Sequence, residues 1–368
     1  MGKPIVGVPE LYSVYRVLRS GVLTQGEKVK EFENLFSNFF ENRDVVSVNS
    51  GTSALHIGLK SLGIGSGDEV LVPSFTFAAT ANAIILAGAT PIFVDSSLDD
   101  FNIDLINIEA KITIKTKAIV VVHLFGLPCQ MVSVKNLAKK HKLFVIEDAA
   151  QAHFASLDGK RVGTYGDVAC FSFYPTKNMT TGEGGAVIFA DAAHARIGRL
   201  LRNQGMEKKY LNEIAGFNLR MSEIQAAIGI QQLKRVMSFT ERRRENASIY
   251  LQSLNQDKIR FQRVEDNAFH VYNQFTIRVH GYSRDLLAKQ LRNEKIETSV
   301  FYPIPVHALK PYKESKEECP HATQLSNTVL SLPVHPAVTK RNIRRISSKI
   351  NQILWRSEKI NRRDEFDN

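Results

Sequence analysis

Short apolar runs alternate with helical segments along residues 45–190 of the chain. Each run is rich in β-branched residues and bounded by Gly, Pro or Asp, which is typical of a buried strand. Strands that alternate with helices predict a mostly parallel sheet with helices on both faces. The predicted strands are Glu69–Phe75, Thr90–Asp95, Lys117–His123, Lys142–Asp148, Asp167–Phe173 and Gly184–Ala190, and the predicted helices are Thr52–Leu62, Phe77–Ala87 and Val132–His141.

The segments on either side of this core have a different pattern. Leu11–Phe40 is expected to be helical on both sides of a glycine-bounded break, and Met221–Leu254 to form one long amphipathic helix with Ser222 as its N-cap. The chain then changes to a mixture of predicted strands (Phe275–Val279, Ser299–Tyr302) and helices (Ser283–Asn293, Thr339–Leu354). We therefore expect a large domain over residues 1–245 and a small α/β domain over residues 246–368.

Composition narrows the class of protein. A chain of 368 residues with 43% hydrophobic and 23% charged residues is typical of a globular protein with two domains, not of a disordered, fibrous or disulfide-rich chain. Cys129, Cys170 and Cys319 lie far apart, so we expect no thiolate metal site and a reducing compartment. The first residues contain no basic segment followed by an apolar run, so we expect no secretory signal and a cytoplasmic location.

Two features raise the question of membrane or nucleic-acid binding. Val70–Val94 is 25 residues long without a charge, but its prolines and polar residues favour a buried strand, helix and strand over a membrane span. The formal net charge is +11, and residues 191–260 hold 13 basic against 7 acidic residues. Residues 341–368 hold 8 basic against 4 acidic residues. Because no set of stacking aromatics accompanies these charges, a solvated surface or attraction for anionic substrates is favoured over nucleic acid.

Ligands of such sheets bind beyond the carboxyl ends of the strands, so the residues that follow each strand are the candidates for chemistry. Gly63–Gly67 resembles part of a dinucleotide loop, but it enters a strand instead of leaving one and is interpreted as a turn. Val48–Leu55 has the right context, a strand, a glycine turn and a helix start. It predicts either an anion site or a plain Ser/Thr N-cap.

Two further segments carry charged side chains at this edge. Asp148 ends a core strand and is either the partner of a charged group or the cap of a following helix. Lys177 follows another core strand, in a turn rich in Thr and Gly. Desolvation would lower its pKa and make the neutral amine a nucleophile for aldehydes. The alternative for an isolated lysine is an ordinary surface turn.

Together these segments resemble the pyridoxal-phosphate enzymes of fold type I, and more narrowly the DegT/DnrJ/EryC1/StrS family of sugar aminotransferases. The resemblance extends over nearly the whole chain and depends on the number and order of its motifs. These are Ser20-Gly21 with Gly26, Ser50–Thr52, Pro73–Phe77, Val122–Gly126, Glu147–His153, Phe171–Gly185, Gly216–Met221, Tyr302–Pro305 with His307, and Leu332-Pro333 with His335-Pro336. It implies a large domain with a mostly parallel mixed sheet and a smaller C-terminal α/β domain.

The resemblance also implies a role for each matched residue. Lys177 matches the lysine that forms a Schiff base with pyridoxal 5'-phosphate, and Asp148 the acid that bonds its pyridinium nitrogen. Gln151 matches a contact to the ring's 3-oxygen, and Phe77 the aromatic residue stacked on the ring. The matched phosphate contacts are Gly51, Thr52, Ser53, Ser172 and, from a second subunit, Asn218, and the candidate substrate contacts are His153, Arg220, Tyr302 and His307.

One position departs from the family pattern. Phe154 stands where the family usually has Gly, which affects the expected geometry near the substrate but not the cofactor. The preceding His153 is either a substrate contact or a satisfied core histidine.

The implied activity is transfer of an amino group from an amino acid, glutamate or glutamine, through pyridoxamine phosphate to a keto group of a nucleotide-linked sugar. The implied assembly is a homodimer with shared active sites, and neither nucleic acid, membrane nor metal is expected. Three alternatives stay open: a cyclitol aminotransferase, a sugar dehydratase of the same family, and a regulatory or DNA-binding relative without catalysis. Relatives that deoxygenate at C3 carry His in place of the lysine, so Lys177 argues against that form of the second alternative.

Overall fold

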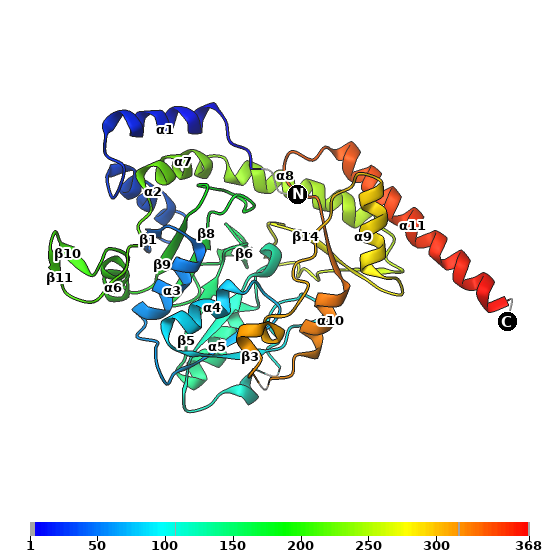
Figure 1. Ribbon diagram of the computed structural model, residues 1–368, viewed down its shortest axis with the longest axis horizontal. Coiled ribbons are helices and arrows are strands. Elements are labelled where there is room, and N and C mark those ends of the chain that lie inside the picture. The colour runs from blue at the N-terminus through cyan, green and yellow to red at the C-terminus, as the bar shows by residue number, and fades with distance from the viewer. Residues whose placement is uncertain (1–3, 107, 316, 367–368) are drawn as a thin grey trace.

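The computed structural model describes residues 4–106, 108–315 and 317–366, with side chains as far as residue 356. Its centre is a seven-stranded sheet in the order β1-β9-β8-β5-β4-β2-β3, with helices packed around it (Figure 1). The neighbouring strands from β8 to β3 are parallel, whereas β9 runs antiparallel to both β8 and β1. The sheet is therefore mixed and mostly parallel, which confirms the predicted fold class.

The predicted core elements are all present, and their ends differ from the prediction by at most two residues. The strands of the sheet are β1 Asp44–Val48, β2 Glu69–Pro73, β3 Thr90–Val94, β4 Thr116–Val122, β5 Phe144–Asp148, β8 Val168–Ser172 and β9 Gly185–Phe189. The helices of this part are α1 Val8–Ser20, α2 Glu27–Ser37, α3 Gly51–Ser61, α4 Ala79–Ala87, α5 Met131–His141, α6 Ala192–Arg202 and α7 Glu223–Leu233.

Both faces of the sheet are buried because side chains alternate along each strand. On β4, Val120 packs in the apolar cluster that includes residues of α3 and α4, whereas its neighbour Val121 packs in the cluster that includes residues of α5. On β8, Cys170 packs in the cluster that includes residues of α3, and the next residue, Phe171, packs in the cluster that includes residues of α2. Burial on both faces explains why the strands read as continuous apolar runs.

A second, three-stranded sheet forms in the C-terminal part of the chain, in the order β12-β14-β15. It shares an apolar cluster with α8, α9 and α11, which includes Tyr250, Ile277, Leu291 and Ile350. The elements are α8 Val236–Ser253, β12 Ile259–Phe261, β14 Phe275–Val279, α9 Arg284–Asn293, α10 Pro320–Thr328, β15 Val329–Leu332 and α11 Lys340–Phe366. The predicted domain boundary after residue 245 lies inside α8 and stays a prediction.

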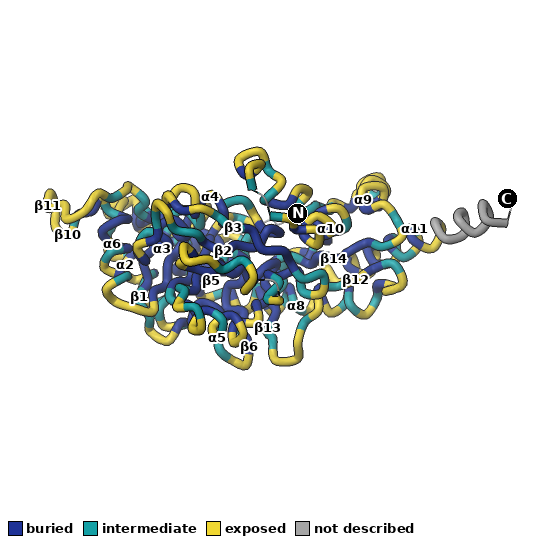
Figure 2. Tube along the Cα trace, turned by 90° about the horizontal axis from the view of Figure 1, so that it is seen from below, coloured by how far each residue is buried: buried dark blue, intermediate teal, exposed yellow. Residues whose placement is uncertain are grey.

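Short elements complete the described fold. They are the strands β6 Ser156–Leu157, β7 Lys160–Arg161, β10 Met206–Lys208, β11 Leu211–Asn212 and β13 Ala268–Phe269, and the 3₁₀ turns η1 Glu109–Lys111, η2 Leu124–Gly126, η3 Val306–Ala308 and η4 Lys310–Tyr312. The β10–β11 hairpin is exposed at one end of the molecule, and α11 extends from the other (Figure 2).

Two predicted elements are wrong. The single helix over 221–254 is two helices, α7 and α8, that meet at Lys234 and Arg235. The break lets α7 pack on α1 and α2 while α8 packs on α11, and the apolar spacing continues across it, so periodicity could not reveal it. Ser222 caps α7 with its hydroxyl and a capping box, as predicted. The expected strand Ser299–Tyr302 is reduced to an isolated bridge between Ser299 and Ser331, because the prolines that follow cannot donate to a sheet.

Other predictions are confirmed. Val70–Val94 forms β2, α4 and β3, and Gly63–Gly67 lies in the turn between α3 and β2. Among the described residues, no helix combines the length and the apolar character needed to cross a bilayer.

Candidate active site

The carboxyl edge of the large sheet gathers the predicted cofactor residues. β5 ends at Asp148, and the parallel strand β8 beside it ends at Ser172. Lys177 lies in the turn after β8, and Gly51 starts α3 directly after β1. Parallel strands end at the same edge, so these residues from distant parts of the sequence meet in one place.

Asp148 is a buried carboxylate with few partners. It is 5% exposed, and its Oδ2 accepts a hydrogen bond from Thr80 Oγ1 at 2.8 Å, while Oδ1 accepts from the backbone N–H of Ala150 at 3.1 Å. Burial raises the pKa of Asp148, although these two bonds and the charge of Lys177 act in the opposite direction. No described helix starts directly after β5, so the alternative of a helix cap loses its support. The carboxylate can accept a further bond from a protonated ring nitrogen.

Lys177 is the amine beside this carboxylate. Its backbone N–H donates to the carbonyl of Tyr174 at 2.9 Å, which fixes the turn, and its side chain is half-buried. Burial lowers the pKa of Lys177 from 10.5 to about 8, and the charge of Asp148 partly opposes this shift. A fraction of the amine is therefore neutral near pH 7 and can attack an aldehyde carbon.

The start of α3 forms a cradle against the end of β8. Ser50 is the N-cap, and its Oγ accepts from the N–H of Ser53 at 3.1 Å. A Cβ added to Gly51 would lie 2.6 Å from Cβ of Ser172, so the backbone reaches Ser172 only because residue 51 is glycine. The N–H groups of the first turn, which includes Gly51 and Thr52, have no partner within the helix and attract anions. This close pairing fits a phosphate held by the predicted residues of both segments.

Gln151, Tyr302 and Phe77 form a second group at the edge. Gln151 Oε1 accepts from the N–H of Phe125 at 2.8 Å, and its Nε2 donates to Tyr302 Oη at 2.9 Å. The ring of Phe77 lies 5.9 Å from that of Tyr302 and is 58% exposed, so one of its faces is open to a ligand. The structure thus brings together a predicted cofactor contact, a predicted stacking ring and a predicted substrate contact.

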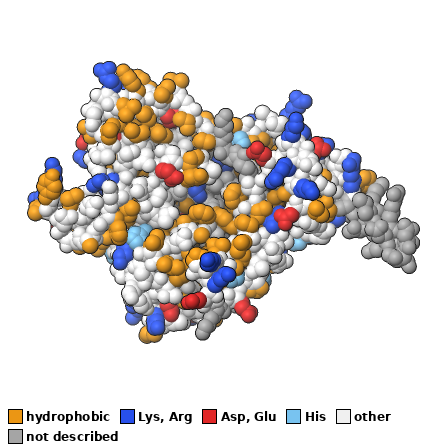
Figure 3. Space-filling view, viewed as in Figure 1, with side chains coloured by type: hydrophobic (Ala, Val, Ile, Leu, Met, Phe, Trp, Pro, Cys, Tyr) orange, Lys and Arg blue, Asp and Glu red, His pale blue; other side chains and the backbone are white. Residues whose placement is uncertain are grey.

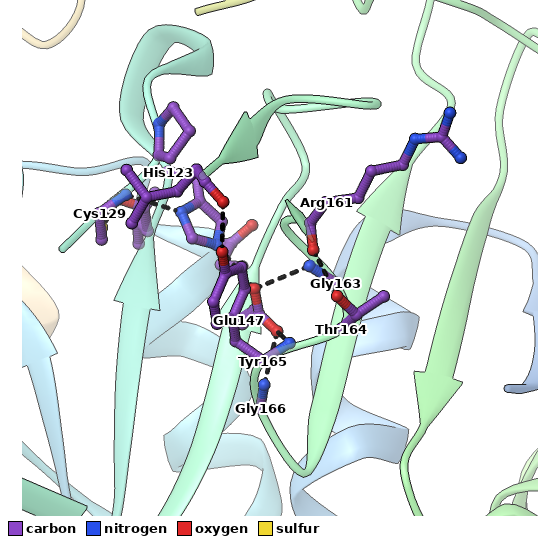
Figure 4. A network of polar contacts seen from close by, with 12 residues as sticks. His123, Cys129, Glu147, Arg161, Gly163, Thr164, Tyr165 and Gly166 are labelled. Carbon is purple, nitrogen blue, oxygen red and sulfur yellow. Dashed lines mark hydrogen bonds and ion pairs between the residues drawn. The ribbon is translucent and has the colours of Figure 1, made fainter. Parts of the chain in front are cut away.

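Sequence reasoning missed a buried network around Glu147, the residue that precedes Asp148 in the chain (Figure 4). Glu147 is fully buried and accepts four hydrogen bonds, from His123 Nε2 at 3.1 Å and from the N–H groups of Gly163, Tyr165 and Gly166 at 2.7–2.9 Å. Burial raises the pKa of Glu147, but the hydrogen bond from His123 and the backbone donors outweigh it and lower the pKa overall.

The partners of His123 fix its tautomer in this network. His123 Nδ1 accepts a hydrogen bond from the N–H of Cys129 at 3.0 Å. The ring hydrogen is therefore on Nε2, which donates the hydrogen bond to Glu147. The sequence contains a signal for this network, because Glu147 interrupts the apolar strand β5 and His123 directly follows the neighbouring strand β4.

His153 and Phe154 lie behind the lysine turn. His153 is fully buried between Phe171 and Phe173, and neither ring nitrogen has a hydrogen-bond partner. Burial and the charge of Lys177 lower its pKa to about 3, so the ring is neutral. Phe154 has φ 65°, a left-handed conformation that explains why glycine suits this position, and its ring stacks on Phe40 at 5.7 Å.

Of the remaining predicted residues, His307 and Arg220 have side-chain partners within the chain. His307 Nδ1 pairs with Ser74 Oγ at 2.5 Å, beside β2. Arg220 donates to Asn203 Oδ1 at 2.9 Å, whereas Asn218 is exposed. The backbone between them is anchored near α3, because the carbonyl of Leu219 accepts from Asn49 N–H at 2.9 Å.

The fold is that of the pyridoxal-phosphate-dependent aminotransferases. The family model for the DegT/DnrJ/EryC1/StrS aminotransferase family matches residues 6–351, and the chain belongs to this family.

Named relatives support the assignment. The chain is 42% identical to a UDP-N-acetyl-3-dehydro-alpha-D-glucosamine 3-aminotransferase from Acidithiobacillus ferrooxidans, over 84% of both chains. It is also 42% identical to a dTDP-3-amino-3,6-dideoxy-alpha-D-galactopyranose transaminase from Aneurinibacillus thermoaerophilus, over 92% of this chain and 93% of the relative. Among solved structures, S. venezuelae DesV in complex with a ketimine intermediate has a TM-score of 0.90, 38% identity and 93% coverage of both chains.

Proposed function

We propose that this aminotransferase moves an amino group from glutamate or glutamine to a keto carbon of a nucleotide-linked sugar. The observation that carries the proposal is the Lys177 amine beside the buried Asp148 carboxylate, in a family whose named relatives act on UDP- and dTDP-linked sugars. The net charge of +11 suits a substrate that carries a diphosphate.

The residues at the sheet edge would hold the cofactor by chemistry that matches its groups. Gly51, Thr52, Ser53 and Ser172 would bind its phosphate, and Asp148 would accept a hydrogen bond from the protonated ring nitrogen. Gln151 Nε2 has a second N–H that would donate to the ring's 3-oxygen while the first bonds Tyr302. Phe77 would cover one face of the ring.

Bound pyridoxal phosphate supplies an electron sink and carries the amino group between the donor and the acceptor. Asp148 would keep the ring nitrogen protonated, because its negative charge stabilises a cation beside it. Lys177 moves a proton at the substrate carbon, first as base and then as acid, and a pKa of about 8 keeps both of its forms populated near neutrality.

The test is a pair of half-reactions, each followed by cofactor absorbance. Protein loaded with pyridoxal phosphate should be converted to the pyridoxamine form by L-glutamate or L-glutamine. That form should then be converted back by members of a panel of nucleotide-linked keto-sugars, with the aminated product identified by mass spectrometry. Conversion by free keto-cyclitols alone would favour the cyclitol aminotransferase, and loss of water from a sugar without gain of nitrogen would favour the dehydratase. Absence of any cofactor absorbance in the purified protein would favour the regulatory relative.

We also propose a homodimer with shared active sites. Support comes from an apolar surface on and around α1, which carries the exposed side chains of Val8, Leu11, Tyr12, Tyr15 and Leu18 (Figure 3). A contiguous apolar surface of this kind is typical of an interface. The exposed Asn218 is available to a neighbouring subunit, as the resemblance implies.

Subunit exchange tests the shared site. Lys177→Ala and the double variant Asn218→Ala/Arg220→Ala should each be impaired alone. A mixed dimer then contains one site with both defects and one intact site, so activity should recover. Verified mixed dimers without recovery above the two parents would mean that residues 218 and 220 act within their own chain.

The location that we propose is the cytoplasm. The three cysteines are free and buried, a state that suits a reducing compartment. Survival of all three thiols in protein purified without reductant, measured by thiol titration after unfolding, is the expected result.

A further inference from the structure

Thr80 is a buried threonine whose hydroxyl bonds the Asp148 carboxylate. It is 1% exposed, and its Oγ1 donates to Asp148 Oδ2 at 2.8 Å. An ionised carboxylate can only accept hydrogen bonds, so the hydroxyl hydrogen of Thr80 is directed at Asp148. The oxygen of Thr80 can in turn accept from Thr76 Oγ1, which lies 3.4 Å away and is also buried. The two threonines therefore form a short chain of hydroxyls that ends on the carboxylate.

The position of Thr80 follows from the first turn of α4. Its N–H donates to the carbonyl of Phe77 at 3.2 Å, so one turn holds the backbone of both the predicted stacking residue and the threonine. In a helix, a threonine hydroxyl often bonds a carbonyl three or four residues earlier. Thr80 instead donates to the end of β5, 68 residues away in the sequence.

A charged partner distinguishes this bond from those of other buried threonines. The hydroxyls of Thr164 and Thr180 donate to backbone carbonyls, which are neutral. A structural anchor of that kind needs no charge, whereas a buried carboxylate is unfavourable without compensation. Among the described residues, Thr80 supplies the one side-chain hydrogen bond that Asp148 accepts. The bond therefore suits a carboxylate that has to stay ionised in a buried place.

Competition for one proton gives this bond a consequence for the cofactor. The ring nitrogen of pyridoxal phosphate and the Asp148 carboxylate would share a proton, which stays on the more basic of the two groups. Burial raises the pKa of Asp148, and the bond from Thr80 is the largest of the effects that lower it. The charge of Lys177 also lowers this pKa, but the proposed function uses that amine for the link with the cofactor. The contribution of Thr80 persists when the cofactor is attached.

We propose that Thr80 is a positioning residue whose hydroxyl keeps the Asp148 carboxylate ionised and thereby leaves the shared proton on the ring nitrogen. Thr80 acts through Asp148 and transfers no proton to the substrate. The inference rests on the role that the proposed function gives to Asp148. Without the hydroxyl, the proton moves towards the carboxylate, and the ring becomes a weaker electron sink.

The first experiment observes the proton directly. Nitrogen NMR of protein loaded with pyridoxal phosphate that is labelled at the ring nitrogen distinguishes the protonated from the unprotonated ring. Wild type should give the protonated signal at neutral pH. Thr80→Val removes the hydroxyl at similar volume and should shift the signal towards the unprotonated one, whereas Thr80→Ser keeps the hydroxyl and should keep the wild-type signal. An unchanged signal in Thr80→Val would overturn the proposal.

Thr116→Val is the matched control. Thr116 is also a buried threonine with a bonded hydroxyl, since its Oγ1 accepts from the N–H of Thr113 at 2.9 Å. It starts β4, at the edge of the sheet opposite to the one that carries Asp148. The ring-nitrogen signal of this variant should stay that of wild type. An equal shift in Thr116→Val would show that the signal follows the loss of any buried hydroxyl, and would reject a specific role of Thr80.

The second experiment is a double-mutant cycle on conversion of the loaded protein by L-glutamate. Thr80→Val should slow this half-reaction roughly tenfold, the effect expected for loss of a hydrogen bond to a charged group. In an Asp148→Asn background the same substitution should change the rate by less than about threefold, because no carboxylate remains for the hydroxyl to act on. Equal losses in both backgrounds would mean that Thr80 acts independently of Asp148, which contradicts the assignment.

Failure of the proposed function has a different signature. The ring-nitrogen signal needs the cofactor but neither donor nor sugar, so it decides about Thr80 even if no amino acid converts wild type. An unprotonated ring in wild type would reject the role of Asp148 itself, and with it that of Thr80. If Thr80→Val does not fold, Thr80→Ala removes the same hydroxyl and is judged by the same signal.

Discussion

Two buried polar clusters, one around Glu147 and one around Lys177, differ in how completely their groups are paired. Glu147 accepts four hydrogen bonds, and all four donors belong to the chain itself (Figure 4). Around Lys177, His153 and Arg243 retain ring and guanidinium nitrogens without a partner. A fully paired cluster holds the chain in one conformation, whereas an unpaired one retains donors and acceptors that water or a ligand can use.

The neighbouring carboxylates Glu147 and Asp148 show the difference within two residues. Both are buried, but the pKa of Glu147 is lowered by its many donors, and the pKa of Asp148 is raised because burial outweighs its two hydrogen bonds. Successive side chains of a strand point to opposite faces, so one carboxylate enters the interior and the other the site. Burial alone therefore does not distinguish a structural carboxylate from a functional one, whereas the number of hydrogen-bond donors around the carboxylate does.

The largest expected effect is that of Lys177→Ala. Without the amine, the covalent link to the cofactor and the proton transfer at the substrate carbon are both lost, so turnover should fall by roughly 10⁴-fold or more. The fold should be kept, because burial and the charge of Asp148 act on the amine but no hydrogen bond to a described residue holds it. Borohydride reduction of wild type followed by peptide mapping should place the cofactor on the peptide that contains Lys177. A label on another lysine would reject the assignment.

The next effect is that of Asp148→Asn. A neutral amide cannot stabilise the protonated ring nitrogen, so the electron sink weakens and turnover should fall roughly 10²- to 10³-fold. Bound cofactor should remain, and the free energy of unfolding should be unchanged or slightly higher, because a buried charge with few partners is removed. Turnover near that of wild type would show that Asp148 only holds Thr80 and Ala150 in place.

Glu147→Gln should mainly lower the stability of the protein, whereas Asp148→Asn should mainly lower turnover. An amide nitrogen would face backbone N–H groups that now donate to a carboxylate, so the free energy of unfolding should fall by about 3 kcal/mol. The folded fraction should keep turnover within about tenfold of wild type, since Glu147 does not line the site. Chemical denaturation and cofactor-normalised rates of both variants, measured in parallel, test the comparison directly. A loss of turnover in Glu147→Gln as large as that in Asp148→Asn would remove the distinction between the two clusters.

Sequence patterns were sufficient for the large sheet and for the residues that follow its strands. Lys177, Asp148 and Gly51 could be singled out because each interrupts an apolar run or a turn at a position where ligands gather. The break between α7 and α8 could not be predicted, because its cause is a change of packing partner and the apolar spacing is continuous. Tertiary contacts, and not local propensity, decide such a break.

Sequence alone could not explain Phe154 or show that Arg243 is buried. The departure at Phe154 was visible, but only the structure reveals its positive φ and the ring of Phe40 that packs against it. Arg243 lies in a run of three arginines that reads as a solvated helix face. Which member of the run is buried depends on where α8 meets residues 272 and 273.

The smallest expected effect concerns pH. The folded chain holds Lys177 at a pKa of about 8, below its ordinary value of 10.5, so the neutral fraction falls about tenfold for each pH unit below 8. Attachment of pyridoxal phosphate to cofactor-free protein, followed by stopped-flow absorbance, should slow in proportion and level off above that pH. Free N-acetyl-lysine, with its ordinary pKa, should show no levelling in the same range. By linkage, the unfolded chain binds more protons between these two pKa values, so the contribution of Lys177 to stability should increase as pH rises through this window.

The pH profile also sharpens the comparison of the two carboxylates. The charge of Asp148 raises the pKa of Lys177 against the effect of burial, so Asp148→Asn should move the inflection of the attachment rate to lower pH. Glu147 is not among the causes of the Lys177 shift, so Glu147→Gln should leave the inflection where it is in wild type. Equal shifts in both variants would mean that the two carboxylates act on the lysine as one charged cluster.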